Sequence, residues 1–169
     1  MVLPSTYADR NCSLARSLEI VGERWTLLIV RDAFFGVRRF GDFADRLGIP
    51  RAVLTTRLKS LVQEGVLTRE DTGGGAVEYH LTGKGLELWP ILRAMMAWGD
   101  DFYSPAGAKR VFRHDEDGGL LDRDGRCEEC GAVVPVPAIR LERGPGFEPA
   151  GAGPTPRRLL EPVGKASDG

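Results

Sequence analysis

Apolar residues recur at helical spacing through residues 12–103 and predict a series of short helices. Leu14, Leu18 and Val21 follow the i, i+4, i+7 spacing of one helical face. A second helix is predicted over 25–35 (WTLLIVRDAFF), because its apolar residues fall on one side and a glycine follows it. The chain therefore opens with two helices that can pack through apolar faces.

A helix-turn-helix is predicted next. Residues 41–47 form a short third helix, GIP at 48–50 is the turn, and residues 51–63 form a fourth helix that begins next to the proline. The apolar positions of this fourth helix share one stripe, which fixes the side that packs on the core. They are Leu54, Leu58 and Leu61.

A hairpin and a last helix complete the pattern. Residues 66–69 and 77–81 have the composition of strands and are joined through a glycine-rich segment. Thr82 is placed to cap one long helix from about 84 to 103. Helices followed by a β-hairpin in this order predict an α+β, mostly α, winged helix-turn-helix fold, with residues 1–103 as the DNA-binding and dimerisation domain.

The exposed side of the fourth helix carries residue types that read DNA grooves. Arginine can bind guanine through two hydrogen bonds, threonine can contact bases, and lysine serves phosphate or guanine. A solvated amphipathic helix is the alternative, and the hairpin that follows makes it less favoured. The predicted DNA-binding residues are Arg38, Arg39, Arg51, Ala52, Thr55, Thr56, Arg57 and Lys59.

Charge supports this prediction only locally. The whole chain has a net charge of −1, which lacks the basic footprint of a nucleic-acid-binding protein. Residues 36–63, however, contain six basic and two acidic side chains and so carry a net charge of +4. The first ten residues lack the apolar core of a signal peptide, no apolar run could span a membrane, and three cysteines are an odd number. A cytoplasmic protein is expected.

The glycine-rich tip of the hairpin is the predicted wing. Gly73, Gly74 and Gly75 allow a sharp turn and close approach to a sugar–phosphate backbone, and Arg69 lies nearby. No phosphate-binding motif follows these glycines. A flexible turn without any DNA contact remains an equal alternative.

The predicted last helix is apolar on nearly every side, which a single chain of 169 residues cannot cover. A two-fold dimer would bury it and space two recognition helices for a palindromic operator. Packing within its own chain is the alternative, and Pro90 should bend the helix. An aromatic effector could also bind there, in a pocket formed by Trp89, Met95, Met96, Trp98 and Phe102.

The order of these motifs resembles the HxlR family of bacterial winged helix-turn-helix regulators, within the MarR-like superfamily. The similar stretch is 12–99, about half the chain, and includes CSLAR at 12–16, IVGERWTLLIVR at 20–31, GVRRFGDF at 36–43 and IPRAVLTTRLKSL at 49–61. It continues with GVL at 65–67 and VEYHLTGKG at 77–85. The resemblance implies a homodimer formed by the first and last helices, which represses or activates nearby genes in response to aldehydes, quinones, hypochlorite or other stresses.

Cys12 matches the cysteine that is the redox or electrophile sensor in some members of this family. It lies at a predicted helix N-terminus between Arg10 and Arg16, where a thiolate is stabilised. A small buried side chain with no sensing role is the alternative. Sensing by Cys12 is thus a hypothesis.

Two further segments follow the helical domain. Residues 104–143 are predicted to be a small β appendage, similar to a zinc ribbon, and the Pro- and Gly-rich residues 144–169 a disordered tail. Cys127 and Cys130 have the spacing of a zinc knuckle, and His114 and Asp117 are the candidates for two further ligands. Asp117 stands where a second knuckle would have its cysteine, so a ribbon that has lost its metal is favoured over a zinc site. A disulfide between the two cysteines would be strained.

No arrangement of residues predicts an enzyme. His114, Cys127 and Cys130 lack the His-x-Glu of zinc deaminases, and no nucleophile elbow is present. A ligand- or protein-binding module that uses the winged helix without DNA is the remaining alternative, and salt-dependent binding to duplex DNA distinguishes the two.

Overall fold

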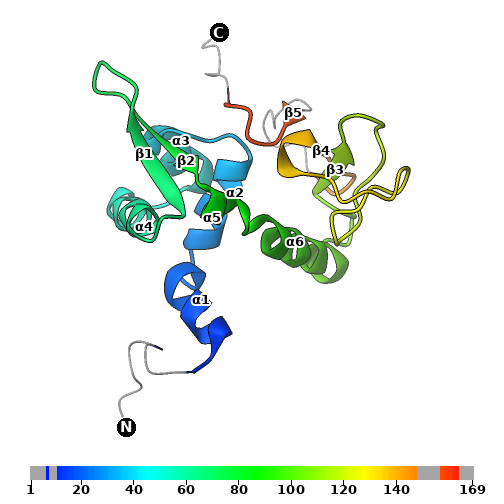
Figure 1. Cartoon of the computed structure of the whole chain (residues 1–169), viewed down its shortest axis with the longest axis horizontal. Helices are drawn as coiled ribbons and strands as arrows, with labels where there is room; N and C mark the ends of the chain where they lie inside the picture. Colours follow the sequence, from blue (N-terminus) through cyan, green and yellow to red (C-terminus); the bar gives the residue numbers. More distant parts are fainter. Residues whose placement is uncertain (1–6, 8–10, 148–156, 164–169) are drawn as a thin grey trace. The chain divides into compact units, whose positions relative to one another are not determined.

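The structure is a computed structural model that describes residues 7, 11–147 and 157–163. It divides into two compact units (Figure 1): residues 1–33 with 37–85, and residues 34–36 with 86–169. The first unit contains the predicted helix-turn-helix and hairpin. The division falls at residue 85 rather than after residue 103, because the last helix packs with the segment that follows it.

The first unit has the predicted order of elements. Its helices are α1 (Ser13–Val21), α2 (Thr26–Phe34, whose last residue falls in the second unit), α3 (Phe40–Leu47) and α4 (Arg51–Gln63). The antiparallel strands β1 (Leu67–Asp71) and β2 (Val77–Leu81) follow, in a register that pairs the first residue of each strand with the last residue of the other. The predicted winged helix-turn-helix is confirmed.

Aliphatic and aromatic side chains from α2, α3 and α4 form the core of the first unit. Phe43 of α3 is fully buried, and Ile29 and Val30 of α2 are equally inaccessible. The stripe on α4 contributes the third side of the core. Because the leucine stripe is buried in this core, the opposite face of α4 points outward.

The predicted single helix after the hairpin is wrong. Residues 83–103 form two helices, α5 (Gly83–Leu86) and α6 (Trp89–Tyr103), and Pro90 lies in the first turn of α6. Proline lacks an N–H and clashes with the preceding turn, so it starts a new helix here instead of bending one. Thr82 caps α5 as predicted, since its hydroxyl accepts a hydrogen bond from the N–H of Gly85 at 3.0 Å.

The second unit combines α6 with a three-stranded antiparallel sheet in the order β3 (Arg110–His114), β4 (Ile139–Arg143) and β5 (Arg157–Arg158), with a 3₁₀ turn, η1 (Val136–Ala138), before β4. Trp89 packs edge-on against Phe112 of β3, with ring centroids 5.2 Å apart, and at the same separation against Phe34. This aromatic cluster explains why α6 belongs to the second unit.

The predicted disorder of residues 144–169 is wrong in part. Arg157 and Arg158 pair with β4, and Leu159 is only 2% exposed. The N–H of Leu160 also donates to the carbonyl of Phe34 at 2.8 Å. Residues 148–156 and 164–169 lie outside the described residues.

Candidate nucleic-acid interface

The turn between α3 and α4 sets the position of the candidate recognition helix. Gly48 ends α3 in the left-handed region with φ 60° and donates its N–H to Ala44 at 2.9 Å. Ile49 is buried, and the carbonyl of Pro50 accepts the first helical hydrogen bond of α4 from Leu54 at 3.0 Å. A left-handed glycine followed by a proline thus ends one helix and starts the next within three residues.

Helix α4 has one buried and one exposed face, as its sequence predicts. Leu54, Leu58 and Leu61 are at most 1% exposed. The opposite face has no acidic side chain, because the helix contains none. Five of its exposed residues belong to the predicted DNA-binding set, and Gln63 at the end of the helix is exposed as well. The five are Arg51, Ala52, Thr55, Thr56 and Lys59.

Most polar groups on this face already have local partners. The hydroxyl of Thr55 donates to the carbonyl of Arg51 at 2.9 Å. The guanidinium of Arg51 lies 5.1 Å from the ring centroid of Phe40, a contact that holds it without neutralising its charge. Lys59 forms no ion pair with any side chain that the structure describes. Two positive charges are therefore available at the exposed face.

Three other arginines of the predicted set have structural partners. Arg57 is half-buried and its Nη2 lies 3.2 Å from a carboxylate oxygen of Glu23, while Nε of Arg39 lies 3.1 Å from Glu78. Arg38 is 8% exposed and donates to the carbonyl of Ala33 at 2.7 Å. The structure thus contradicts a groove contact by Arg38, because its guanidinium is buried. Burial lowers the pKa of Arg38, and Glu78 opposes that shift.

Sequence reasoning missed a buried carboxylate that supports this site. Asp32 of α2 is 1% exposed and pairs with Nη2 of Arg31 at 2.7 Å and with Nε of Arg46 on α3 at 3.5 Å. It links α2 to the first helix of the helix-turn-helix. The sequence feature that could have indicated this ion pair is the single acidic residue of α2, Asp32.

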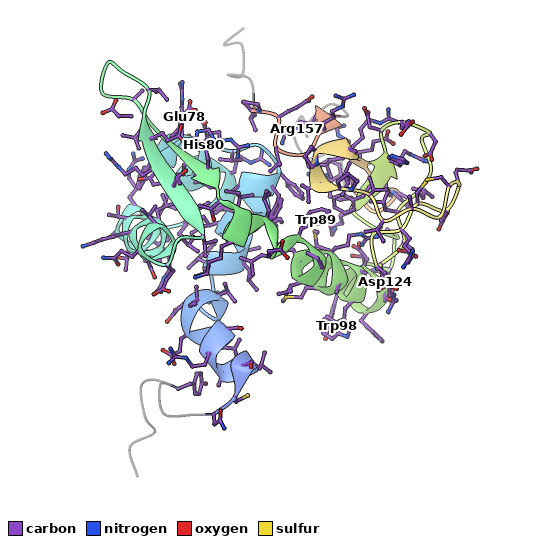
Figure 2. All side chains as sticks on the ribbon, in the orientation of Figure 1. Glu78, His80, Trp89, Trp98, Asp124 and Arg157 are labelled. Atoms are coloured by element: carbon purple, nitrogen blue, oxygen red, sulfur yellow. The ribbon has the colours of Figure 1, made fainter. Side chains whose placement is uncertain are left out.

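The wing has the glycine geometry that was predicted but an acidic surface. Gly73, Gly74 and Gly75 have φ values of 89°, 63° and 79°, which favour glycine. Strands β1 and β2 with their turn contain three carboxylates and one arginine, Arg69, which is exposed. Figure 2 shows Glu78 and His80 on the same strand, and Nε2 of His80 lies 3.5 Å from Glu78. Electrostatics thus favour α4 over the wing as the DNA-contacting element.

Comparison with known proteins agrees with this architecture. Residues 20–106 match the HxlR-like helix-turn-helix family. This chain belongs to that family. It is 43% identical over 139 residues to an uncharacterized HTH-type transcriptional regulator of Mycobacterium tuberculosis, covering 80% of this chain and 88% of the relative. The family is one of transcriptional regulators.

Two solved structures are similar to this HxlR-like chain. The crystal structure of PA1607, a candidate transcription factor, is 34% identical with a TM-score of 0.57 and covers 83% of this chain and 90% of its own. The redox regulator HypR in its oxidized form is 30% identical with a TM-score of 0.50, and covers 53% of this chain and 96% of its own. The similarity to PA1607 therefore extends beyond the first unit.

The HxlR-like chain exposes apolar residues on two helices. On α6, Ile91, Met95, Trp98 and Phe102 repeat at i, i+4, i+7 and i+11 and are each about half exposed or more. Figure 2 shows Trp98 projecting away from the helix. Leu14 and Leu18 of α1 are also exposed. In the described part of the chain, no helix is long and apolar enough to cross a membrane.

The residues predicted to line an effector pocket at the dimer interface differ in exposure within the single chain, and a pocket completed by a second copy stays a prediction. Trp89 is 5% exposed in the core of the second unit, whereas Met95, Trp98 and Phe102 are exposed. Trp89 in the first turn of α6 packs against Phe112, whereas these three side chains of the later turns are exposed to solvent. Cys12 is the N-cap residue of α1 and is exposed in the single chain, so it fills no space in the core of its own chain.

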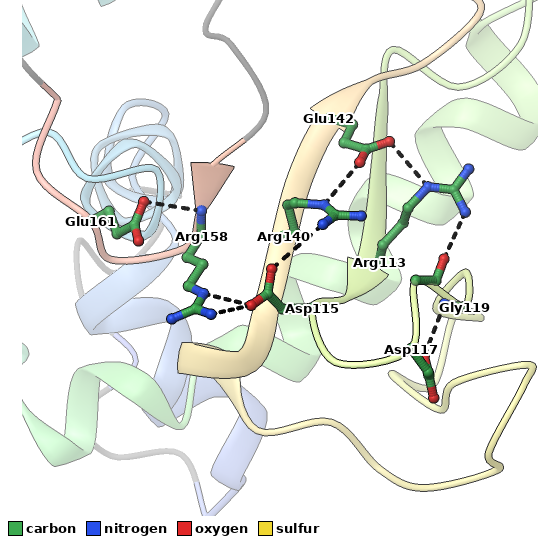
Figure 3. Close-up of polar contacts among 9 residues, drawn as sticks. Arg113, Asp115, Asp117, Gly119, Arg140, Glu142, Arg158 and Glu161 are labelled. Carbon is green, nitrogen blue, oxygen red and sulfur yellow. Dashed lines mark hydrogen bonds and ion pairs between the residues drawn. The ribbon is translucent and has the colours of Figure 1, made fainter.

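The candidate metal residues lie together. His114, Asp117, Cys127 and Cys130 each place one ligand atom within 4.8 Å of the other three. Asp117 lies at the position where the sequence lacks a cysteine, and the N–H of Gly119 hydrogen-bonds to its carboxylate at 2.9 Å (Figure 3). This bond, followed by contacts with both cysteines, holds the pKa of Asp117 well below its usual range.

Proposed function

We propose that this protein is a sequence-specific DNA-binding transcriptional regulator that inserts α4 into the major groove. The observation that carries this proposal is the buried leucine stripe on α4, which leaves Arg51, Thr55, Thr56 and Lys59 exposed together. A helix with an apolar side fixed in the core and a cationic side free of carboxylates fits a polyanionic groove.

The residues of α4 divide by chemistry. Arg51 lies in the first turn, the part of a recognition helix that usually meets base edges, and it can bind guanine through two hydrogen bonds. The methyl groups of Thr55 and Thr56 suit thymine. Lys59, two turns further, suits a phosphate, and Arg39 can add a second backbone contact at the start of α3.

We further propose that the protein acts as a homodimer on a palindromic operator. The exposed apolar stripe of α6 and the exposed leucines of α1 are surfaces that a second copy would remove from water. Two copies of α4 related by a two-fold axis would read two half-sites of opposite orientation.

Selection of bound duplexes from a random DNA library by the purified full-length protein tests this function. We expect an inverted repeat, with an affinity that falls steeply as salt concentration rises, because bound phosphates release counterions. Light scattering of the free protein should give the mass of a dimer. Recovery of random sequences, or no salt-dependent binding, would instead favour a ligand- or protein-binding module on a winged-helix scaffold.

We propose Cys12 as the sensor of an electrophile or oxidant. Its thiol is exposed at the start of α1, the helix that carries part of the apolar surface proposed for dimerisation, and the structural relative HypR is named as a redox regulator. A quinone or hypochlorite should release the protein from its operator, and Cys12→Ser should abolish that release. An unchanged response in Cys12→Ser would remove Cys12 from the mechanism.

A further inference from the structure

Four side chains with metal-binding chemistry meet in the second unit, and DNA recognition by α4 makes no use of them. They are His114, Asp117, Cys127 and Cys130. We propose that they form a structural Zn²⁺ site, with the aspartate in the place of the fourth ligand. The proposal is independent of the proposed DNA-binding function, because it concerns the second unit alone.

The spacing of the donor atoms fits a tetrahedron around zinc. With zinc bonds of about 2.3 Å to sulfur and about 2.0 Å to nitrogen and oxygen, tetrahedral corners lie roughly 3.3–3.6 Å apart for N···O, S···O and S···N pairs. Nδ1 of His114 lies 3.0 Å from Asp117, and Sγ of Cys130 lies 3.5 Å from Nδ1 of His114. Sγ of Cys127 lies 3.4 Å from the same carboxylate oxygen, Oδ2 of Asp117. Small side-chain shifts would thus admit an ion.

The ligands come from two turns with the same backbone. Each turn has the form ligand-x-x-ligand-Gly, and the glycines, Gly118 and Gly131, have φ values of 76° and 72°. The N–H of Gly118 donates to the carbonyl of His114 at 2.9 Å, and that of Gly131 donates to Cys127 at 2.8 Å. The two turns are therefore equivalent, although their ligand side chains differ.

The equivalence extends to the hydrogen bonds that surround the ligands. Cys127 donates its N–H to the carbonyl of Ala132 at 2.9 Å, just as His114 donates its own to Gly119 at 2.9 Å. In the first of these turns, the N–H of Gly119 also bonds to the carboxylate of Asp117 at 2.9 Å. Such N–H groups orient a ligand and stabilise it as an anion. Asp117 thus occupies the position that Cys130 holds in the other turn.

The donor set suits zinc and leaves no open coordination position. Two thiolates, an imidazole and a carboxylate are all common ligands of Zn²⁺, and four protein ligands are typical of structural sites. Cys127 is 2% exposed, and a Cβ on Gly119 would lie 2.4 Å from its sulfur, so the turns already pack closely around this ligand.

The loops around the cluster give a metal a structural role. Between β3 and η1, the described residues form only isolated bridges, including those that pair Arg113 with Leu120 and Leu121 with Cys127. Ion pairs lie around the sheet beside them, where Asp115 accepts hydrogen bonds from Arg158 and Glu142 from Arg113 (Figure 3). A metal would add direct bonds between the two turns, which single backbone hydrogen bonds and isolated bridges already connect.

Zinc content and cobalt spectroscopy of the full-length protein test the proposal. We expect about one equivalent of zinc per chain after purification under reducing conditions. Titration of the metal-free protein with Co²⁺ should give the intense visible bands of a tetrahedral complex and a thiolate-to-cobalt band in the near ultraviolet. A chain with less than about a tenth of an equivalent of zinc and only an octahedral cobalt spectrum would show a hydrogen-bonded cluster without metal, and would overturn the proposal.

Variants identify the ligands. Cys127→Ser should lower bound zinc at least about tenfold, whereas Glu128→Gln, at the exposed neighbouring position, should retain it. Asp117→Cys should still bind one ion and raise the thiolate-to-cobalt band by about half, as the thiolates increase from two to three. An unchanged band in a folded Asp117→Cys protein would exclude this position from the site. Failure of DNA binding would change none of these readouts.

Discussion

The candidate DNA-binding residues of the first unit and the candidate metal ligands of the second unit are supported in different ways. In the first unit the anchor is apolar: Leu54, Leu58 and Leu61 are buried, and the candidate DNA-binding residues face outward from the same helix. In the second unit two of the four candidate ligands, His114 and Cys127, are themselves buried among backbone hydrogen bonds, while Asp117 and Cys130 are exposed.

In the first unit, the residues that stabilise the fold differ from those proposed to contact DNA. In the second unit, the candidate ligands take part in both the fold and the proposed site. On α4, the exposed face can change without loss of packing, because the energy of the core comes from the leucines. In the two turns of the proposed zinc site, each candidate ligand also belongs to the hydrogen-bond framework, so its replacement would disturb both the site and the fold. Four predictions test this contrast.

Metal removal should have the largest effect, confined to the second unit. With a chelator present, we expect the amides of Gly118 and Gly131 to lose hydrogen-exchange protection by roughly 100-fold or more, because the ion binds only the folded turns. The amide of Leu58 in α4 is the internal control and should keep its protection. If the chelator left the protection of all three amides unchanged, the two units would not differ in their dependence on metal.

Leu58→Ala should destabilise the first unit by about 2–5 kcal/mol, because it leaves a cavity at a position that is 1% exposed. Urea unfolding followed by circular dichroism measures this change. Lys59→Ala, the next residue on the opposite face, is the matched control and should stay within about 0.5 kcal/mol of the parent. Similar losses in both variants would mean that α4 is not anchored on one side.

The double variant Arg51→Ala with Lys59→Ala should bind its operator roughly 10–100-fold more weakly while retaining the dimer mass. The loss follows from one base contact and one phosphate contact, and the salt dependence should decrease by about one unit of slope. Fluorescence anisotropy measures the affinity. Arg123→Ala, an exposed arginine of the second unit, is the control. Unchanged operator affinity in the double variant would show that α4 is misassigned.

Arg69→Ala in the wing should have the smallest effect, below about threefold in DNA affinity, because three carboxylates share its hairpin. The same anisotropy assay applies. If this variant lost more DNA affinity than the α4 double variant, the wing and not α4 would be the main DNA-contacting element.

Local patterns predicted much of the first unit. The leucine spacing of α4, the Gly-Ile-Pro turn and the hairpin composition each depend on neighbouring residues, and the structure reproduces all three. The break at Pro90 was also readable, because proline is favoured in the first turn of a helix. The overall apolar character of residues 86–102 concealed it.

Other features depend on distant contacts and had no local signal. Arg38 resembles its exposed neighbour Arg39, and only packing buries one and leaves the other outside. The strand at residues 157–158 lies in a Pro- and Gly-rich segment and exists because β4 offers an edge to pair with. Asp117 is different, because its place in the turn made it a candidate ligand from the sequence. Only the fold, however, brings its carboxylate to the other three candidates.

The sequence by itself determined the helix-turn-helix and its outward-facing residues, because helical periodicity states which side of a helix is apolar. The tertiary structure alone decided which arginines remain available for DNA and whether four scattered ligands meet. Burial and convergence are properties of residues far apart in the chain, and they arise only when packing brings those residues together.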